Sequence, residues 1–434
     1  MSLRFPDSHS TLLRAPVAVF GGGVSGIAVR DLLAAVGASA VIYDEKPGAG
    51  DRVAFGEAEA AACRLVVHSP GFGSGHPWFG AARRAGCVSL GELDFASLFW
   101  RGKRVAVTGT NGKTTVTEFL AHALRQAGRE AFATGNVGYS FSRLALDRDG
   151  GGADDWAICE VSSFQAEAMS LFRADSVLWT NFAEDHLERH CGLDAYFAAK
   201  HRLVLQSPGA LVLVGSSVRA HAQRLGVTLP AGSLVPTENL FPDALLAGTV
   251  FEDYPQRENF VLASAWWSRN GLPEEMLYAA ARDFRLGRHR LSKVAEVGGV
   301  AWWNDSKATN FHAVEAALER FRAPVLLIAG GRAKGGDLDA FVRRIMPKVA
   351  HVFLIGETRP AMSAACVHHH LPHTDCVSLD AAVAAASACA HAGDNVLLSP
   401  GFASFDMFRG YDHRGDVFEN LVKNLGARVA VPPA

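Results

Sequence analysis

Short apolar runs recur along the whole chain, and most of them are followed by a polar, glycine- or serine-containing turn. The runs Val17–Phe20 and Val105–Val107 each lead through such a turn into a stretch with helical periodicity. Further runs of the same kind lie at residues 39–43, 65–68, 156–161, 176–180, 211–214, 300–303, 324–329, 351–355 and 395–398. Apolar strands that alternate with helices are typical of an α/β sheet, so the pattern predicts an α/β protein.

A length of 434 residues suggests about three domains at a typical domain size of about 150 residues. The first domain is expected over residues 1–100, because a basic linker, Arg101–Lys103, follows a helical stretch that ends at Trp100. The second is expected over residues 101–286 and the third over 287–434. We therefore expect a Rossmann-like N-terminal domain, a central P-loop ATPase-like domain and a Rossmann-like C-terminal domain.

The central domain opens with a strand, a glycine-rich loop and a helix, which is the setting of a phosphate-binding loop. Backbone N–H groups and the helix N-terminus favour phosphate oxygens there, a lysine reaches the outer phosphates, and a hydroxyl can ligate Mg²⁺. The general pattern has a glycine where this chain has Val107. The residues expected to hold ATP here are Gly109, Thr110, Asn111, Gly112, Lys113, Thr114 and Thr115.

A second glycine turn, Gly21–Gly26, has the form G-x-G-x-x-G and directly follows the first apolar strand. Asp44 ends the next strand, where a Rossmann unit places a carboxylate on a ribose hydroxyl. The turn suits NAD or any other nucleotide pyrophosphate. Ser69–Gly71, at the end of a third strand, could add phosphate-binding groups or form an ordinary turn between a strand and a helix.

Composition narrows the class of protein. With 49% hydrophobic residues, 20% charged residues and a net charge of -2, the chain gives no electrostatic reason to bind nucleic acid or an anionic membrane. It has no apolar signal-peptide core near its start and no run approaching the ~18 apolar residues of a membrane span. Seven scattered cysteines without a CxxC suit a reducing compartment. We expect a cytoplasmic monomer.

A group of histidines and cysteines could be read as a zinc site, or as a solvated loop between two apolar strands. The second interpretation is favoured, because the spacing fits no common zinc pattern. The residues are Cys366, His368, His369, His370, His373 and Cys376.

Polar groups also follow the later strands. Glu160 ends a buried apolar strand, where a carboxylate is costly unless something binds it, and Mg²⁺ is the obvious partner in a phosphate-loop protein. The third domain carries Lys307, Lys334 and Ser404 close after its strands. One nucleotide site, one triphosphate site and one acceptor site together indicate an ATP-dependent ligase.

Five motifs resemble those of the Mur ligases of peptidoglycan synthesis. They are Thr108–Thr115, Gly135–Gly138, Glu160–Gln165, Glu184–His186 and Asn304–Asn310. The resemblance extends over nearly the whole chain, including residues 399–415. Alanine-adding members usually have histidine in place of Asn111, and the later ligases usually lack a leading glycine turn, so the combination is similar to the glutamate-adding type.

The resemblance implies that D-glutamate is joined to UDP-N-acetylmuramoyl-L-alanine at the expense of ATP, through an acyl phosphate. It implies catalytic roles for Lys113, Glu160, His186, Lys200 and Lys307. Mg²⁺ would be held by Thr114, Glu160, His186 and a carbamate on Lys200, a residue that by itself would be read as a solvated lysine. Further ATP contacts are implied for Asn259, Arg290, Asp305 and Lys307.

The remaining roles concern the two other substrates. The UDP-substrate would contact Gly23, Val24, Ser25, Asp44, Ser69, Pro70, Gly71, Asn136, Ser162 and Gln165. The incoming glutamate would contact Thr309, Lys334, Ser404, Phe405 and Tyr411. A lysine and hydroxyl groups suit an acidic amino acid.

The chain departs from the family pattern in two places. Of the usual His-Asn-x-x-Asn before the adenine pocket, only Asn259 is retained. The usual Ser-Pro-Ala-Cys-Ala-Ser is here Ser399–Ser404 with Gly401 and Phe402, and Phe405 and Tyr411 replace residues that are more often Leu and Phe. These departures leave open a ligase for L-glutamate or another amino acid. A folylpolyglutamate-type ligase is disfavoured because that type lacks the UDP-type leading domain. The complete set of Lys113, Glu160, His186 and Lys200 argues against a nucleotide-binding protein without catalysis.

Overall fold

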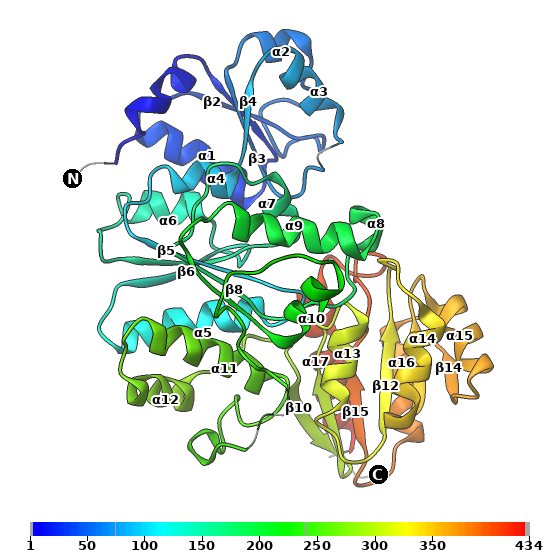
Figure 1. Cartoon of the computed structure of the whole chain (residues 1–434). Helices are drawn as coiled ribbons and strands as arrows, with labels where there is room; N and C mark the ends of the chain where they lie inside the picture. Colours follow the sequence, from blue (N-terminus) through cyan, green and yellow to red (C-terminus); the bar gives the residue numbers. More distant parts are fainter. Residues whose placement is uncertain (1–2, 74, 239, 241, 430–434) are drawn as a thin grey trace. The chain divides into compact units, whose positions relative to one another are not determined.

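The computed structural model describes residues 3–73, 75–238, 240 and 242–429, and these form three β-sheets flanked by helices (Figure 1). The chain divides into two compact units. The first comprises the chain up to Phe182 with Phe197–Thr249 and Glu258–Phe284. The second comprises Ala183–Tyr196, Val250–Arg257 and the chain from Arg285 onward. Two of the sheets belong to the first unit and the third to the second unit. No described helix is both long and apolar enough to cross a membrane.

The first sheet is parallel, with the strand order β2-β1-β3-β4. Its strands are β1 (Val17–Phe20), β2 (Ala40–Tyr43), β3 (Leu65–His68) and β4 (Val88–Gly91). The helical elements around it are η1 (Asp7–Leu13), α1 (Val24–Ala35), α2 (Glu57–Ala61), α3 (Pro77–Arg84) and α4 (Glu92–Ser97). All four side chains of β1 are buried, as expected for a central strand covered on both faces.

The second sheet is also parallel, with the order β6-β7-β5-β8-β9. Its strands are β5 (Lys103–Thr108), β6 (Ala131–Gly135), β7 (Trp156–Glu160), β8 (Ser176–Trp179) and β9 (Leu211–Val214). Its helical elements are α5 (Lys113–Gln126), α6 (Phe141–Asp147), α7 (Ser163–Ala168), α9 (Leu193–Leu205), α10 (Ser216–Arg224), η2 (Ala244–Leu246), α11 (Gln256–Arg269) and α12 (Glu274–Asp283). Because β5 lies between β7 and β8, the loop after β5 opens at the switch point where open α/β sheets bind ligands.

Two buried carboxylates on α4 join the first two sheet domains. Glu92 accepts a hydrogen bond from the backbone N–H of Ser142 at 2.6 Å. Asp94 accepts bonds from the backbone N–H groups of residues 170, 171 and 172 at 2.7, 3.1 and 2.7 Å, and from the Ser170 hydroxyl at 2.9 Å. Both carboxylates are almost fully buried. A short helix of the first domain thus binds the backbone of the second at two places.

The third sheet has the order β10-β11-β15-β12-β13-β14, and all of its pairs are parallel except β10 with β11. Its strands are β10 (Ser292–Val297), β11 (Val300–Asn304), β12 (Val325–Gly330), β13 (Val349–Ile355), β14 (His373–Asp375) and β15 (Asn395–Leu398). The helical elements of this unit are α8 (Leu187–His190), α13 (Phe311–Leu318), α14 (Leu338–Ile345), η3 (Met346–Lys348), α15 (Arg359–His368), α16 (Leu379–Cys389) and α17 (Tyr411–Val429).

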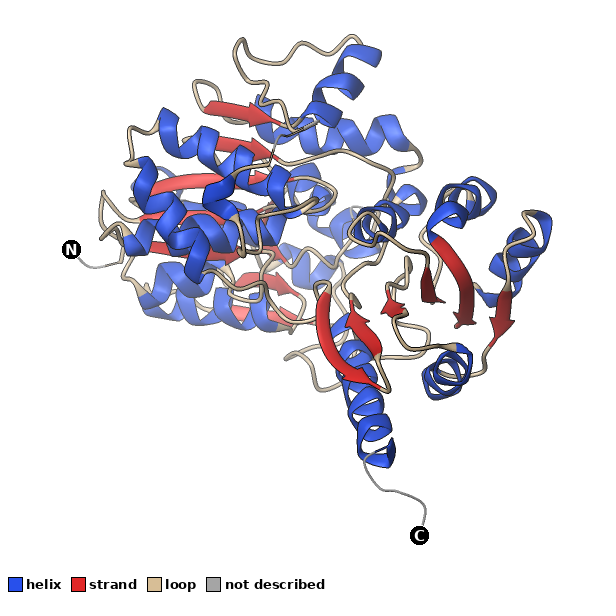
Figure 2. Cartoon of the chain, turned by 90° about the horizontal axis from the view of Figure 1, so that it is seen from below, coloured by secondary structure: helices blue, strands red, loops and turns tan. Residues whose placement is uncertain are grey.

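Two hydrophobic cores lie against this third sheet. Phe311, Phe341 and Met362, from α13, α14 and α15, pack in one core. Val383 and Phe418, from α16 and α17, pack in the other. Figure 2 shows helices on both sides of the strands. Because β15 returns between β11 and β12, the carboxyl ends of these three strands are adjacent, with Leu398 paired to Asn304 on one side and to Ile328 on the other.

The predicted α/β class with three sheet domains is confirmed. One local expectation was wrong. The histidine and cysteine group is not a loop, because Cys366 and His368 lie in α15 and His373 begins β14. Its two cysteines are buried.

Candidate active site

The loop between β5 and α5 has the backbone geometry of a phosphate cradle. Gly109 and Gly112 have φ values of 149° and 82°, which L side chains rarely adopt. A Cβ at Gly109 would lie 1.9 Å from the Thr180 hydroxyl oxygen, and one at Gly112 would lie 2.2 Å from Oδ1 of Asn259. Glycine is therefore required at both positions by conformation and by space. Gly112 is the N-cap of α5, so the helix N-terminus opens into this loop.

Two residues after β8 fix the shape of this loop. The Thr180 hydroxyl donates to the carbonyl of Asn111 at 2.6 Å. Asn181 accepts from the backbone N–H of Asn111 through Oδ1 at 2.9 Å and from that of Thr110 through its carbonyl at 3.1 Å. The Lys113 ammonium folds back over the loop and donates to the carbonyls of residues 109 and 110 at 2.9 and 2.8 Å. Sequence reasoning did not assign Thr180 or Asn181 to the site, because a loop-shaping residue carries no motif of its own.

Thr114, Glu160 and Asn136 meet at the end of β7. The Thr114 hydroxyl donates to Oε2 of Glu160 at 2.6 Å, and the Asn136 amide donates to Oε1 at 2.8 Å. The Glu160 side chain is buried. Two of the four predicted metal ligands, Thr114 and Glu160, are therefore in direct contact, and their hydroxyl and carboxylate oxygens are the donors that Mg²⁺ prefers.

Lys200 is not a solvated lysine. Only 1% of its surface is exposed, and its ammonium donates to the carbonyl of Gly109 at 2.8 Å. Burying an ammonium group costs free energy unless hydrogen bonds or opposite charges compensate it. The interpretation of Lys200 as an ordinary solvated charge is therefore wrong. The contact places Lys200 against the phosphate loop.

The leading glycine turn is held by Asp44. One oxygen of this carboxylate accepts from the backbone N–H of Gly22 at 2.8 Å, and the other accepts from that of Lys46 at 2.9 Å. Val24 is 68% exposed and begins α1, whose N-cap is Gly23. The helix N-terminus of the predicted nucleotide site thus lies at the surface, next to Ser25.

Ser69, at the end of β3, is the second feature of this nucleotide site. Its hydroxyl is buried and has no hydrogen-bond partner among the described residues. A buried hydroxyl without a partner is unfavourable, and a ligand that pairs with it would relieve that cost. Pro70 and Gly71 follow it in the same turn.

Ser162 and Gln165 have a structural explanation of their own. They form a capping box at the start of α7, in which the Ser162 hydroxyl accepts from the N–H of Gln165 at 3.2 Å and Oε1 of Gln165 accepts from the N–H of Ser162 at 2.9 Å. A capping box satisfies two backbone donors at a helix N-terminus. Their contact with a UDP-substrate stays a prediction.

In the second unit, Asp305 and Lys307 follow β11. Asp305 accepts from the backbone N–H of Leu291 at 3.0 Å and from the Ser399 hydroxyl at 2.9 Å. Burial raises the pKa of its carboxyl to about 7, against the opposing effects of these bonds and of the Arg290 charge. The Lys307 ammonium lies 4.2 Å from the ring centroid of Tyr411 and donates to its hydroxyl at 2.9 Å.

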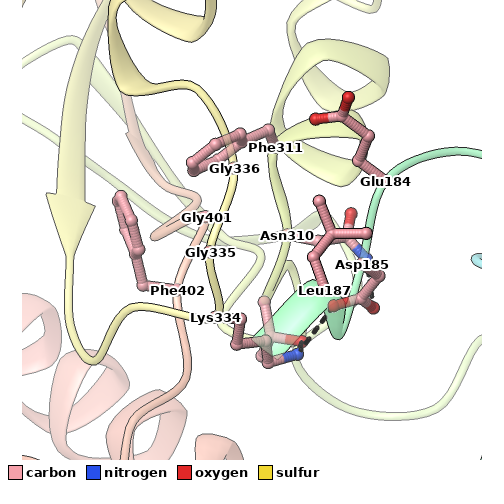
Figure 3. A pocket seen from close by; sticks show the side chains of 11 residues that line it. Glu184, Asp185, Leu187, Asn310, Phe311, Lys334, Gly335, Gly336, Gly401 and Phe402 are labelled. Atoms are coloured by element: carbon pink, nitrogen blue, oxygen red, sulfur yellow. Dashed lines mark hydrogen bonds and ion pairs between the residues drawn. The ribbon is translucent and has the colours of Figure 1, made fainter. Parts of the chain in front are cut away.

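A pocket opens beside these residues, at the carboxyl ends of β11, β12 and β15 (Figure 3). It encloses about 300 Å³, including its open mouth. Its lining residues are Glu184, Asp185, Leu187, Thr309, Asn310, Phe311, Lys334, Gly335, Gly336, Gly401 and Phe402. The Lys334 ammonium reaches the Thr309 hydroxyl at 3.2 Å and Oδ1 of Asp185 at 3.3 Å. The structure thus brings the two predicted residues Thr309 and Lys334 together on one wall.

Asp185 and Asn310 were not predicted as contacts for the amino acid. The Asn310 amide donates to Oδ2 of Asp185 at 3.0 Å, so the buried carboxylate is held by an amide and an ammonium. The aromatic wall was missed as well: the rings of Phe311 and Phe341 stack at 4.2 Å, and Phe402 meets Phe311 edge-on at 5.4 Å. Phenylalanine side chains in a site cannot be distinguished in the sequence from those of a hydrophobic core.

Three of the five residues predicted to contact glutamate, Ser404, Phe405 and Tyr411, lie outside that pocket lining. Ser404 is buried, whereas Phe405 is 67% exposed. The predicted metal ligand His186 is the N-cap of α8 and lies in the left-handed region, with φ of 54°. Its ring lies 3.7 Å from carboxylate oxygens of Asp185 and of Glu188. It belongs to the second unit, whereas Thr114, Glu160 and Lys200 belong to the first.

Two histidines of the group that could be interpreted as a zinc site lie beside a carboxylate. Among the described residues, Asp339, His368 and His369 form one group whose ligand atoms lie within 4.8 Å of one another. The imidazoles of His368 and His369 lie 2.6 and 3.0 Å from Oδ1 of Asp339, which are hydrogen-bond distances. Asp339 and His368 are exposed, so ordinary ion pairing accounts for the group.

Two family models match parts of the chain. Residues 107–226 match the family model described as "Mur ligase middle domain". Residues 289–402 match the model described as "Mur ligase, glutamate ligase domain". The glycine-rich loop after β5 lies in the first match, and most residues that line the pocket of the second unit lie in the second match.

Relatives similar over almost their whole length carry the name UDP-N-acetylmuramoylalanine--D-glutamate ligase. One from Caldanaerobacter subterraneus is 32% identical over 94% of this chain and 98% of the relative. One from Nitratidesulfovibrio vulgaris is 35% identical over 94% of this chain and 96% of the relative. The solved structure of a UDP-N-acetylmuramate-alanine ligase from Thermotoga maritima shares the fold, with a TM-score of 0.59, 14% identity and coverage of 95% of this chain and 100% of that one. The chain therefore belongs to the Mur ligase family, and it is a ligase.

Proposed function

We propose that this enzyme joins D-glutamate to UDP-N-acetylmuramoyl-L-alanine with hydrolysis of ATP to ADP and phosphate, in the cytoplasmic stage of peptidoglycan precursor synthesis. The relatives at 32% and 35% identity bear the name of this activity. The observation that carries the proposal is the phosphate loop of the first unit, with Thr114 and Glu160 in contact at its base. We further propose that residues 1–100, 101–286 and 287–434 serve the UDP-substrate, ATP and glutamate respectively.

The loop from Gly109 to Thr115 would bind the ATP phosphates through its backbone N–H groups, the α5 N-terminus and Lys113. Lys113 now donates to two loop carbonyls, and it would exchange these for phosphate oxygens. Thr114 and Glu160, together with His186 and a modified Lys200, would hold Mg²⁺. The hydroxyl and carboxylate oxygens that face each other at 2.6 Å fit that ion, which would neutralise charge on the phosphates.

A carbamate on Lys200 would fit the same site. The buried amine lies against the Gly109 carbonyl, where an ammonium is desolvated. Loss of a proton from the ammonium, followed by addition of CO₂ to the amine with loss of a second proton, would replace this buried cation by an anionic oxygen ligand for a divalent ion. The residue type, the burial and the contact with the loop support this modification.

The pocket of the second unit would receive glutamate. The Lys334 ammonium and the Thr309 hydroxyl would bind a carboxylate of the amino acid, which is the charge-assisted pairing that suits an acidic ligand. Asp185 is buried and would face a positively charged amine. Ser404, Phe405 and Tyr411 would complete the site, and Arg290, Asp305 and Lys307 would contact the nucleotide.

The reaction would take place in two steps. The carboxylate of the lactoyl-L-alanine group attacks the γ-phosphorus of ATP, the bond to the β-phosphate oxygen breaks, and ADP leaves. The amine of glutamate then attacks the carbonyl carbon of the acyl phosphate, phosphate leaves with the carboxylate oxygen, and a proton is released from the amine. Lys113 would stabilise the charge on the transferred phosphoryl group.

Phosphate release by the full-length protein tests this proposal. Purified protein is mixed with UDP-N-acetylmuramoyl-L-alanine, ATP and Mg²⁺, and each glutamate enantiomer is added separately. We expect release that depends on D-glutamate, with a product of the corresponding mass. When the substrate carboxylate carries ¹⁸O, one label should appear in the released phosphate, because the attacking oxygen departs with the phosphoryl group.

Two controls separate the alternatives. Lys113→Met should lose activity by a factor of about 1,000, whereas Lys423→Met, on an exposed face of α17, should remain active. Preference for L-glutamate or another amino acid would replace the proposed substrate. No phosphate release with any amino acid would favour a protein that binds nucleotides without catalysis.

A further inference from the structure

Arg414 is a buried arginine that no proposed catalytic role uses. It lies in the first turns of α17, and only 1% of its surface is exposed. Burial lowers the pKa of the guanidinium to about 10, so the group stays charged at neutral pH. Among the described residues no carboxylate lies within ion-pair distance of it. A buried charge of this kind is tolerated only when hydrogen bonds satisfy its donors.

Within the described part of the chain, the hydrogen bonds of its guanidinium go to two loops of the same unit. Nε donates to the Ser306 hydroxyl at 3.0 Å, and Nη2 donates to the Ser306 carbonyl at 2.9 Å. Nη1 and Nη2 both donate to the carbonyl of Phe402, each at 3.2 Å. The planar guanidinium therefore bridges the segment after β11 to the segment after β15.

The two bridged segments serve different ligands in the proposed function. Ser306 stands between Asp305 and Lys307, on the nucleotide side. Phe402 lines the amino-acid pocket, but Arg414 does not. The Ser306 hydroxyl also donates to the carbonyl of Tyr411 at 2.7 Å, and Lys307 donates to the Tyr411 hydroxyl at 2.9 Å. Arg414 thus fixes Ser306 against the start of α17, where the partner of Lys307 lies.

Stability alone gives no reason for a charge at this position, because an apolar side chain in a buried site often stabilises as well or better. A guanidinium adds a fixed geometry: its donors hold two carbonyl groups at a set separation. We propose that Arg414 is a positioning residue that couples the nucleotide-side loop at Asp305–Lys307 to the amino-acid loop at Gly401–Ser404. This inference rests on the proposed function, and it makes binding of ATP and of the amino acid depend on one side chain that lines neither site.

Steady-state kinetics of the full-length protein tests the coupling. Arg414→Met and Arg414→Lys are compared with Arg409→Met, which removes an exposed arginine from the same segment. In Arg414→Met we expect the KM values for ATP and for D-glutamate to rise together, by about tenfold each. The KM for the UDP-substrate should stay within about twofold, because that substrate is assigned to the other unit. The KM values of Arg414→Lys for ATP and D-glutamate should lie between those of wild type and Arg414→Met. Those of Arg409→Met should match wild type.

A purely structural role would have a different signature. It would lower kcat in proportion to the folded fraction, measured by circular dichroism, and leave every KM unchanged, and this result would overturn the inference. If Arg414→Met is insoluble, Ser306→Ala and Arg414→Lys decide the question: paired increases of about threefold in both KM values support the coupling, and unchanged values overturn it. Wild-type inactivity with every amino acid would instead overturn the proposed function, so the two failures are distinct.

Discussion

Asp305 gives the sharpest prediction of how stability depends on pH. The substitution Asp305→Asn keeps the shape of the side chain and both of its contacts: the amide oxygen can accept from the N–H of Leu291, and the amide nitrogen can donate to the Ser399 hydroxyl. It removes only the ionisation. The folded carboxyl has a pKa of about 7, because burial disfavours the charged form.

The expected magnitude follows from the difference between the folded and unfolded pKa values. In the unfolded chain an aspartate titrates near 3.9, so the folded state holds the proton more tightly by about 3 pKa units, or about 4 kcal/mol. This stabilisation is fully present below the unfolded pKa and is lost as the pH rises through the folded pKa. Of the total, about 3 kcal/mol should be lost between pH values of about 5 and about 8.

Urea denaturation of both proteins at a series of pH values measures this loss. The free energy of unfolding of wild type minus that of Asp305→Asn should fall by about 3 kcal/mol over that interval, since other titrating groups cancel in the difference. Asp375→Asn, an exposed carboxylate at the end of β14, is the matched control and should show no such trend. If the free energies of wild type and Asp305→Asn stay parallel within about 0.5 kcal/mol, burial does not control this carboxyl and the reasoning is refuted.

Three further substitutions test other parts of the molecule. Lys200→Ala should lose activity by a factor of about 100, with partial recovery when a short carboxylic acid such as acetate is added to the phosphate-release assay. Full activity in that variant would exclude a required carbamate. Phe402→Ala should raise the KM for D-glutamate by about tenfold, because it removes part of the aromatic wall of the pocket, and an unchanged KM would remove this residue from the amino-acid site. Asp94→Ala should lower the free energy of unfolding by about 3 kcal/mol, since three N–H groups, one of them on the buried Phe172, lose their acceptor. Urea titration measures this, and a loss no larger than that of the exposed Glu57→Ala would contradict it.

Much of the fold followed from the sequence because buried parallel strands are short, apolar and bounded by turns. The strand Asn395–Leu398 was predicted with its observed bounds. The helix α10 was missed, since its sequence is polar and only Val218 and Ala222 are buried. The short strand β14, with one histidine and no buried residue, gives no apolar signal at all.

Some residues of the candidate site could be predicted from the sequence and others could not. Lys113 and Thr114 were predicted from a motif, because phosphate binding constrains neighbours along the chain. Asp185 and Arg414 were not predicted as site residues, because their roles arise from contacts with residues more than a hundred positions away. A carboxylate or a guanidinium far from its partners in sequence cannot be told from a surface charge until the backbone brings the partners together.

The two carboxylates of α4 have a consequence for how the protein can be cut. Residue 100 is the predicted end of the first domain, but Glu92 and Asp94 accept hydrogen bonds from the backbone N–H groups of Ser142 and of Ser170–Phe172. A fragment starting at residue 101 would present those N–H groups to water and lose the apolar cover around them. A fragment ending at residue 100 would expose Glu92 and Asp94, which are buried in the complete chain. The two segments should therefore be expressed together, because hydrogen bonds between them cross residue 100 inside one folded unit.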